Sequence, residues 1–381
     1  TYMSTTTEGY PMVRFPEVYD ECEGIIAPDG SYDADSVAAL ELTDDELREL
    51  YGSMMQARAL EERGLSLQRR GELHFWMECR GLEAAHVGTG AALSGRDWMN
   101  TEWRQYGAHI QRGRPLEDIL LFWLRGYEEW DAERVDEMEP YERRLPHIVA
   151  VGTQVPQTVG LMWGRKLQGH DEVGLVGVGD GGASKGDFHA GLNFAGVLEL
   201  PVVFTVFNNQ WAISTQVERQ TAADTYADRA AGYGFDGVVV DGNDVLATYR
   251  ATKRAVERAR EGEPTLLELL TYRRGAHSSS DADDYRTDAD REAWIERDPI
   301  DRYEAFLEDR GLLGSGDFEA IREAAERRAK EAADTALEIA AEQSPEEVFD
   351  EVFANPPEYI DEQREELLSL VERHGEEAFR W

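Results

Sequence analysis

The sequence predicts an α/β fold, a doubly wound and mainly parallel sheet with helices on both faces, extended by an N-terminal arm and C-terminal helices. Its 381 residues are enough to bury a large core. Four short apolar runs of strand length occupy the middle of the chain, at 173–178, 201–207, 237–241 and 265–271. Amphipathic segments separate these runs, and this alternation is typical of parallel strands joined by helices.

The N-terminal part is predicted to be an arm followed by helices. Residues 1–42 are acidic and contain prolines and glycines that break any regular pattern. Thr43 and Glu46 have the spacing of a capping box, and apolar residues follow at helical spacing, so the α/β domain is expected to cover 43–315. Helical patterns continue over about 82–93 and 115–125, and the acidic segment 127–143 is expected to loop over the surface.

Helices are also predicted between the strands and in a C-terminal extension. The segments between strands read as helices over about 184–199 and 243–261, the second opened by Asn243 as its N-cap. A helical extension is expected over 316–381, with a long charged helix near 317–342. The sequence Ser344-Pro345 then predicts the start of another helix, because proline is well suited to the first helical position.

The charge of the chain is strongly acidic. Lysine and arginine total 39 against 77 aspartates and glutamates, which gives a formal net charge of −38. This composition suggests a halophilic prokaryotic host, because molar salt shortens the Debye length to about 3 Å and screens the self-repulsion. It also argues against nucleic acid as a partner, since binding to phosphates requires a basic face.

Cysteine usage and hydropathy indicate a cytoplasmic protein. Cys22 and Cys79 are too few and too far apart for a disulfide framework or a zinc cluster, which points to a reducing compartment. No apolar run approaches the roughly 20 residues that span a bilayer. The first residues also lack the pattern of a signal peptide, so we expect no membrane association.

Polar residues follow two of the predicted strands at the point where each strand ends. Gly179-Asp180-Gly181 comes after the first apolar run, and Asn208-Asn209 after the second. The carboxyl ends of parallel strands share one edge of a sheet, so these clusters are expected to lie together. Carboxylate and amide oxygens suit Mg²⁺, while glycines and a helix N-terminus suit a phosphate. The sequence therefore predicts a magnesium ion held against a diphosphate.

These residues resemble a known family. The stretch from Gly179-Asp180-Gly181 to Asn208-Asn209 is similar to the thiamine diphosphate motif, and its surroundings resemble the alpha subunit of 2-oxo acid dehydrogenase decarboxylating components. Four further segments agree in order and spacing: ARALEERGLSLQRRGELHFW, GTQVPQTVG, VVVDGNDVLATYRATKRA and TYRRGAHSSSDADDYRT. The resemblance covers about 42–353 and implies the thiamine diphosphate-binding fold.

The resemblance implies roles for residues around the diphosphate. Asp180 and Asn209 would bind Mg²⁺ through their side chains, and Trp211, where relatives often carry tyrosine, would bind it through its backbone carbonyl. Arg104 would clamp the diphosphate, and Trp103 would pack on the cofactor. The glycines next to Asp180 would let the backbone approach the phosphates; they are Gly179, Gly181 and Gly182.

The resemblance also implies a site for the reacting end of the cofactor. The backbones of Val149 and Val151 would hold the aminopyrimidine ring. His277 would be the catalytic residue of this chain, a donor facing the diphosphate and the substrate carboxylate. Phe75, Met77 and Val151 fall in the region of the substrate pocket, and their apolar character fits an aliphatic 2-oxo acid.

The activity implied is oxidative decarboxylation of a 2-oxo acid, branched-chain or pyruvate, with transfer of the acyl group to a lipoyl group. In this family the glutamate that activates the cofactor belongs to a beta subunit. The expected partners are therefore that beta subunit, in an α2β2 heterotetramer, and a lipoyl acyltransferase component. The chain alone is expected to be inactive.

Departures from the family pattern leave other functions open. Relatives bind potassium with a serine and a proline where this chain has 147–150, and branched-chain members place arginine where Phe207 stands. An acetoin dehydrogenase alpha subunit and a non-catalytic paralogue therefore remain alternatives. Residues 177–182 also match the dinucleotide pattern of an NAD-dependent oxidoreductase, but the next strand does not end in the acidic residue that such a fold uses.

Overall fold

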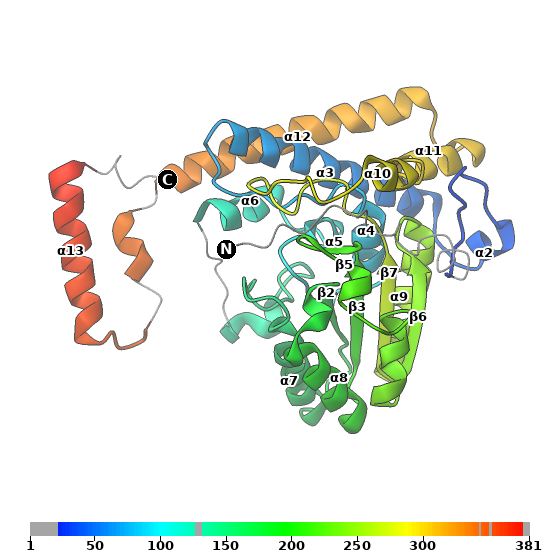
Figure 1. Ribbon diagram of the computed structural model, residues 1–381, viewed down its shortest axis with the longest axis horizontal. Coiled ribbons are helices and arrows are strands. Elements are labelled where there is room, and N and C mark those ends of the chain that lie inside the picture. Colours follow the sequence, from blue (N-terminus) through cyan, green and yellow to red (C-terminus); the bar gives the residue numbers. More distant parts are fainter. Residues whose placement is uncertain (1–21, 126–131, 343, 350–352, 376–381) are drawn as a thin grey trace, which may run out of the picture.

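The computed structural model describes residues 22–125, 132–342, 344–349 and 353–375, and its centre is a five-stranded parallel sheet (Figure 1). The strands follow the order β1-β2-β3-β7-β6 across the sheet. Their bounds are Trp98–Asn100 for β1, Gly174–Gly179 for β2, Val202–Asn208 for β3, Asp236–Asp241 for β6 and Thr265–Leu270 for β7. The four predicted strands and the parallel α/β architecture are confirmed, and β1 is an addition.

Helices cover both faces of this sheet, as doubly wound folds require. Strand β3 shows the division, because Val203 and Phe207 face one core cluster while Phe204 and Val206 face the other. The first face packs against α4 (Glu83–Ala91) and α9 (Val245–Arg260). The second packs against α7 (Gln154–Leu167), α8 (Gly186–Leu198) and the 3-10 helix η4 (Ala227–Tyr233).

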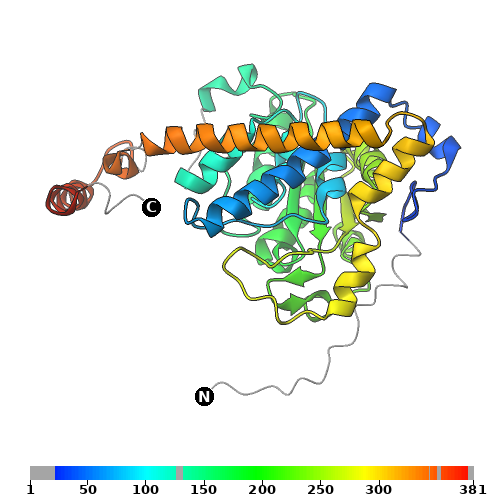
Figure 2. The same ribbon diagram turned by 90° about the horizontal axis from the view of Figure 1, so that it is seen from above.

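A layer of helices lies over the edge of the first face. Helix α3 (Asp44–Arg69) and α6 (Leu116–Arg125) are crossed by the long helix α12 (Ser315–Ala341), as Figure 2 shows. Alanines on α12 are buried at this contact, and small side chains let the helices approach closely. The helices α5 (Tyr106–Gln111), α10 (Asp288–Ile295) and α11 (Pro299–Asp309) complete the layer and the loops beside it.

Residues 22–42 are joined to the core. Ile25 and Ile26 are buried, and both of their amides donate to the carboxylate of Asp244 at 2.6 Å. A short helix, α2 (Ala34–Ala38), precedes α3, whose predicted capping box between Thr43 and Glu46 is present. The predicted boundaries of the arm, the domain and the C-terminal extension stay predictions.

One predicted helix cap is wrong, and one predicted helix starts slightly later than expected. Helix α9 is capped by Asp244 rather than Asn243, because Asp244 has the extended backbone of an N-cap and accepts from the amides of Leu246 and Ala247. Helix α8 begins at Gly186, two residues later than expected, because a 3-10 turn, η2 (Gly182–Ser184), precedes it.

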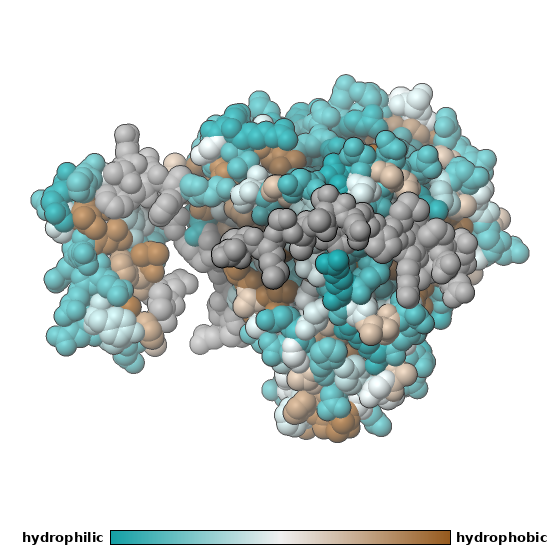
Figure 3. Space-filling view, in the orientation of Figure 1, coloured by the Kyte–Doolittle hydropathy of each residue, from teal (hydrophilic) through white to brown (hydrophobic). Residues whose placement is uncertain are grey.

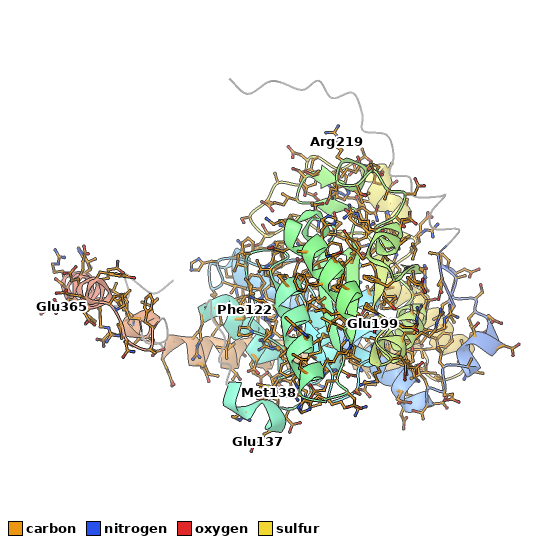
Figure 4. All side chains as sticks on the ribbon, turned by 90° about the horizontal axis from the view of Figure 1, so that it is seen from below. Phe122, Glu137, Met138, Glu199, Arg219 and Glu365 are labelled. Carbon is orange, nitrogen blue, oxygen red and sulfur yellow. The ribbon has the colours of Figure 1, made fainter. Side chains whose placement is uncertain are left out.

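The C-terminal region differs from the expected helix at Ser344-Pro345. A 3-10 turn, η5 (Pro345–Phe349), forms there, and the α-helix α13 (Glu358–His374) begins only after the prolines at 356 and 357, which cannot continue a helix. Helix α13 stands away from the body of the molecule, with the side chain of Glu365 pointing outward (Figure 4).

The acidic segment 127–143 was expected to form a surface loop, and residues 127–131 lie outside the described residues. The remainder forms a 3-10 helix, η1 (Ala132–Glu137), followed by turns. Two short strands, β4 (Trp211–Ala212) and β5 (Thr215–Gln216), and the 3-10 helix η3 (Val217–Arg219) follow β3. No helix among the described residues is both long enough and apolar enough to cross a membrane.

Candidate active site

Four neighbouring strand ends bring the candidate site together. Because β1, β2, β3 and β7 are parallel neighbours, the segments that follow them lie along one edge of the sheet. Arg104 follows β1, Asp180 follows β2, Asn209 follows β3, and His277 follows β7. Arg104 and His277 thus lie at the same edge of the sheet, although more than 170 positions separate them in the sequence.

Asp180 is buried at the end of β2, with 1 % of its surface exposed. Its carboxylate accepts from the Gln220 amide at 2.6 Å, and its backbone carbonyl accepts from the Tyr226 hydroxyl at 3.3 Å. Burial raises the pKa of Asp180 to about 6. Neither Gln220 nor Tyr226 was predicted from the sequence, because both lie in an irregular segment without a strand pattern.

Asn209 and Trp211 belong to a tight turn after β3. The Asn209 amide oxygen accepts from the Trp211 backbone N–H at 3.3 Å, and Gln210 between them has a φ of 73°. An amide oxygen has two acceptor sites, so this bond leaves one for a cation. The Trp211 ring is buried 5.3 Å from the ring of Tyr285, which fixes the backbone of the turn.

The glycines beside Asp180 are required by close contacts. A Cβ on Gly181 would lie 2.9 Å from Ala212 Cβ, and a Cβ on Gly182 would lie 2.8 Å from a carboxylate oxygen of Glu102. Glu102 was not predicted as part of the site, although it precedes Trp103. It is buried, accepts from the Gly179 N–H at 3.1 Å, and has a pKa raised to about 7 by burial.

Arg104 connects the end of β1 to the segment after β7. Its guanidinium donates to the backbone carbonyl of Glu78, to that of His277 at 2.8 Å, and to His277 Nδ1 at 3.2 Å. A guanidinium only donates, so Nδ1 must accept and the proton of the neutral ring lies on Nε2. Burial, then the charges of Arg104 and Arg273, lower the pKa of His277 to about 3, so the ring is neutral near pH 7.

Trp103, Val151 and Val149, the other residues predicted to contact the cofactor, differ in how near they lie to these site residues. The Trp103 ring lies edge-on to the His277 ring, with 6.3 Å between centroids. Val151 lies against the Gly179–Gly182 turn, since its Cγ1 is 3.2 Å from the position of a Gly182 Cβ. Val149 is different, because 77 % of its surface is exposed.

The two residues predicted for the substrate pocket have unlike surroundings. Phe75 is 37 % exposed and lies beside Trp123, with 5.7 Å between ring centroids. Met77 is buried, and the next residue, Glu78, accepts a hydrogen bond from Arg104. Met77 is therefore connected to the arginine of the site, while Phe75 lies closer to the surface.

The residues present fit a magnesium ion and a diphosphate. One buried carboxylate and one amide oxygen are hard ligands of the kind that Mg²⁺ takes together with phosphate oxygens. In the described part of the chain, no group of three histidines, cysteines, aspartates or glutamates is placed to bind a metal ion. An ion at Asp180 and Asn209 would therefore need further ligands of other kinds, such as phosphate oxygens or backbone carbonyls. Arg273, after β7, was not predicted; it is fully buried, and its Nε and Nη1 have no hydrogen-bond partner in the structure.

Comparison with known proteins agrees with this geometry. Residues 51–346 match the family model described as "Dehydrogenase E1 component". The chain is 38 % identical over 351 residues to the 3-methyl-2-oxobutanoate dehydrogenase subunit alpha of Mycobacterium tuberculosis, covering 92 % of this chain and 94 % of that protein. It is 41 % identical over 295 residues to the pyruvate dehydrogenase E1 component subunit alpha of Bacillus subtilis, covering 77 % and 78 %. The chain therefore belongs to the dehydrogenase E1 component family.

Proposed function

We propose that the chain is the alpha subunit of a 2-oxo acid dehydrogenase E1 component, which uses thiamine diphosphate and Mg²⁺ in the oxidative decarboxylation of a 2-oxo acid. The observation that carries this proposal is the convergence of Arg104, Asp180, Asn209 and His277 at the carboxyl ends of four parallel strands. Relatives named for 3-methyl-2-oxobutanoate and for pyruvate match this chain, so its substrate is a short or branched aliphatic 2-oxo acid.

Three residues would hold the magnesium ion. Asp180 supplies a carboxylate, Asn209 an amide oxygen and Trp211 a backbone carbonyl, and phosphate oxygens and water complete an octahedral set. The Gly179–Gly182 turn would offer backbone N–H groups to the phosphates, because its glycines carry no side chain of their own between the backbone and a bound anion. Gln220 holds the Asp180 carboxylate in position from its other side.

The chain's own residues prepare the site for the reaction. When bound, thiamine diphosphate supplies a carbon nucleophile and an electron sink for the loss of CO₂. Arg104 supplies a fixed positive charge for the diphosphate. His277, with its single proton on Nε2, would donate one hydrogen bond, to the diphosphate or to the substrate carboxylate, and would keep this role across neutral pH, because its pKa is low.

Residues near the reacting end of the cofactor are assigned by the family pattern. The backbones of Val149 and Val151 would hold the aminopyrimidine ring, and Trp103 would pack on the cofactor. Phe75, Met77 and Val151 would line the substrate pocket. Val149 and Phe75 are exposed in the single chain, which supports a second subunit that covers them and completes the cofactor and substrate sites.

An exposed apolar surface supports a beta subunit as that partner. Four large side chains on the adjacent helices α7 and α8 are between 43 % and 75 % exposed; they are Trp163, Leu167, Phe194 and Val197. Figure 3 shows apolar residues gathered at the end of the molecule formed by these helices. The exposed side chains lie toward the C-terminal ends of both helices, while the helix starts lie next to the cofactor turn, so this surface supports a contact with a partner subunit beside the site.

We propose an α2β2 heterotetramer that delivers the acyl group to a lipoyl acyltransferase component. A reducing, cytoplasmic location fits the two cysteines, which form no disulfide within the described residues.

Co-expression with the beta subunit in high salt tests the function. With thiamine diphosphate and Mg²⁺, we expect reduction of ferricyanide that depends on 3-methyl-2-oxobutanoate or pyruvate, and a complex whose mass by light scattering equals two copies of each subunit. Acetoin as the only donor identifies the acetoin-cleaving alternative. A complex that assembles and turns over none of these compounds contradicts the proposal and favours a non-catalytic paralogue.

Substitution of Asp180 tests the metal site. Asp180→Ala removes a direct ligand, so calorimetry should show Mg²⁺-dependent binding of thiamine diphosphate weakened by at least about 100-fold. The control is Glu257→Ala, which removes an exposed carboxylate on α9 and should leave binding unchanged. Equal affinity of the Asp180 variant and the wild type would remove Asp180 from the site.

A further inference from the structure

Two arginines are buried at the site without a carboxylate beside them. Arg104 is 3 % exposed and Arg273 is 0 % exposed. Within the part of the chain that the structure describes, no carboxylate oxygen lies within 4.0 Å of either guanidinium. A buried charge that forms no ion pair is costly, so an anion bound between these cations would stabilise the site.

The charge of Arg273 also acts on Arg104. Burial lowers the pKa of both guanidiniums. For Arg104, burial and then the charge of Arg273 lower the pKa to about 10. Both groups still carry their charge near pH 7. Two like charges in a buried place repel each other, and an anion placed between them removes that repulsion.

Arg273 has donors available for such an anion. Its Nη2 donates to the backbone carbonyl of Ile213 at 2.9 Å and to the Tyr285 hydroxyl at 2.8 Å. These two bonds hold the side chain between the turn after β3 and the segment after β7. Its Nε and Nη1 are buried and have no partner in the described structure, and buried donors left unpaired cost about 1–3 kcal/mol each, more when charged.

The location of Arg273 points to the anion. The backbone N–H of Arg273 donates to the backbone carbonyl of Asn209 at 3.3 Å, and its Nη2 donates to the carbonyl of Ile213. The site therefore has a cation beside the turn that carries Asn209 and Trp211. The position before Asn208-Asn209 offers none, because Phe207 is buried in the core against His86, with 5.4 Å between ring centroids.

We propose that Arg273 binds the diphosphate of thiamine diphosphate through the Nε and Nη1 donors left free in the structure, as the second guanidinium of a pair with Arg104. The inference rests on the proposed function, since it takes the anion from the same cofactor. Arg273 is thus a binding residue in its own right, in addition to connecting two loops through Nη2. A diphosphate needs more positive charge than one arginine supplies, and two guanidiniums match its phosphate oxygens.

Binding measurements on the alpha–beta complex test this. Arg273→Met keeps the length of the side chain and removes its charge and donors. With Mg²⁺ in excess, calorimetry should show thiamine diphosphate binding about ten- to a hundred-fold more weakly than in the wild type, as expected for a charge-assisted hydrogen bond. Binding of thiamine, which has no phosphate, should be unchanged.

Tyr285→Phe is the matched control. It removes one bond that positions Arg273 and leaves Nε and Nη1 intact, so the affinity for thiamine diphosphate should change less than three-fold. If Tyr285→Phe and Arg273→Met weaken binding equally, Arg273 acts by positioning the loop and the proposal is wrong. Equal weakening for thiamine and thiamine diphosphate would also contradict it, because the contact would not be with phosphate.

A further variant tests the proposal if Arg273→Met does not assemble with the beta subunit. Arg273→Lys keeps the charge but loses the planar donors, so it should assemble and bind thiamine diphosphate with intermediate affinity; wild-type affinity would overturn the proposal. Failure of the wild-type complex to bind thiamine diphosphate with Mg²⁺ would overturn the proposed function and this inference together. Wild-type binding with unaffected Arg273 variants would overturn the inference alone.

Discussion

His86 is a fully buried imidazole beneath the candidate site. Its ring lies edge-on to Phe207, and neither ring nitrogen has a hydrogen-bond partner in the described structure. Burial, and then the charge of Arg104, lower the pKa of His86 to about 3, against 6.5 for an exposed histidine. The ring is therefore neutral in the folded protein at any pH where the fold persists.

This histidine predicts a loss of stability in mild acid. Below about pH 6.5 the unfolded chain binds a proton at this position and the folded chain does not, so the free energy of unfolding falls by about 1.4 kcal/mol per pH unit until about pH 3. His86→Leu removes this contribution, and the melting temperature of the variant should fall less than that of the wild type between pH 7.5 and 5. If the melting temperatures of the variant and the wild type fall equally over that range, the lowered pKa of His86 is contradicted.

Single residues also show what the sequence could predict. Asp180 and Asn209 were predicted to meet because each directly follows an apolar run, and parallel strands place such positions on one edge. Gln220 and Tyr226 could not be found in this way, because their positions depend on irregular segments whose path is set by tertiary contacts rather than by periodicity. Arg273 follows the predicted strand 265–271 by two residues, so the same rule places it at this edge.

At the scale of elements, Asp244 joins a helix to a distant segment. One of its oxygens accepts from the amides of Leu246 and Ala247 at the start of α9, and the other accepts from Ile25 and Ile26. One carboxylate thus satisfies four backbone donors, all of them buried. The segment around residue 25 depends on it for its place on the core.

Removing this cap should be costly. We expect Asp244→Ala to lower the free energy of unfolding by about 2–4 kcal/mol, because buried amides lose their acceptor in addition to the helix cap. Thr43→Ala removes the exposed cap of α3 and should cost about 1 kcal/mol. Urea unfolding of the two variants compares them directly. Similar losses would show that the bonds to Ile25 and Ile26 add nothing.

Elements with a strong local pattern were predictable, and those without one were not. The strands β3 and β7 are mostly apolar and fully buried, and both were predicted within one residue at each end. Strand β1 has three residues, too few for a pattern, and is held by pairing with β2. Helix α7 contains Pro156 in its first turn and two glycines, residues that usually indicate a loop.

At the scale of the whole molecule, the net charge of −38 predicts a dependence on salt. Repulsion among carboxylates opposes the compact state, and salt shortens its range from about 10 Å at 0.1 M to about 3 Å at 1 M. The melting temperature should therefore rise with NaCl, most steeply below about 1 M. A melting temperature that is flat or falls with NaCl would contradict this explanation of the composition.

A charge-neutralised variant provides the control. Glu323, Glu326 and Glu331 are exposed on α12, and changing all three to glutamine removes three negative charges without touching the core. The variant should gain less from NaCl than the wild type does. An identical gain would assign the effect of salt to hydrophobic burial rather than to screening.

The strand order of the sheet has a consequence for synthesis of the chain. Strand β7 lies between β3 and β6, yet it is the last of the five to leave the ribosome. Until it inserts, β6 has no neighbouring strand, and Arg273 and His277 are absent from the edge where Asp180 and Asn209 already lie. The nascent chain therefore acquires its cofactor pocket in a single late event, and a transcript truncated before residue 265 would produce a sheet with an open gap, a ready substrate for chaperones and proteases.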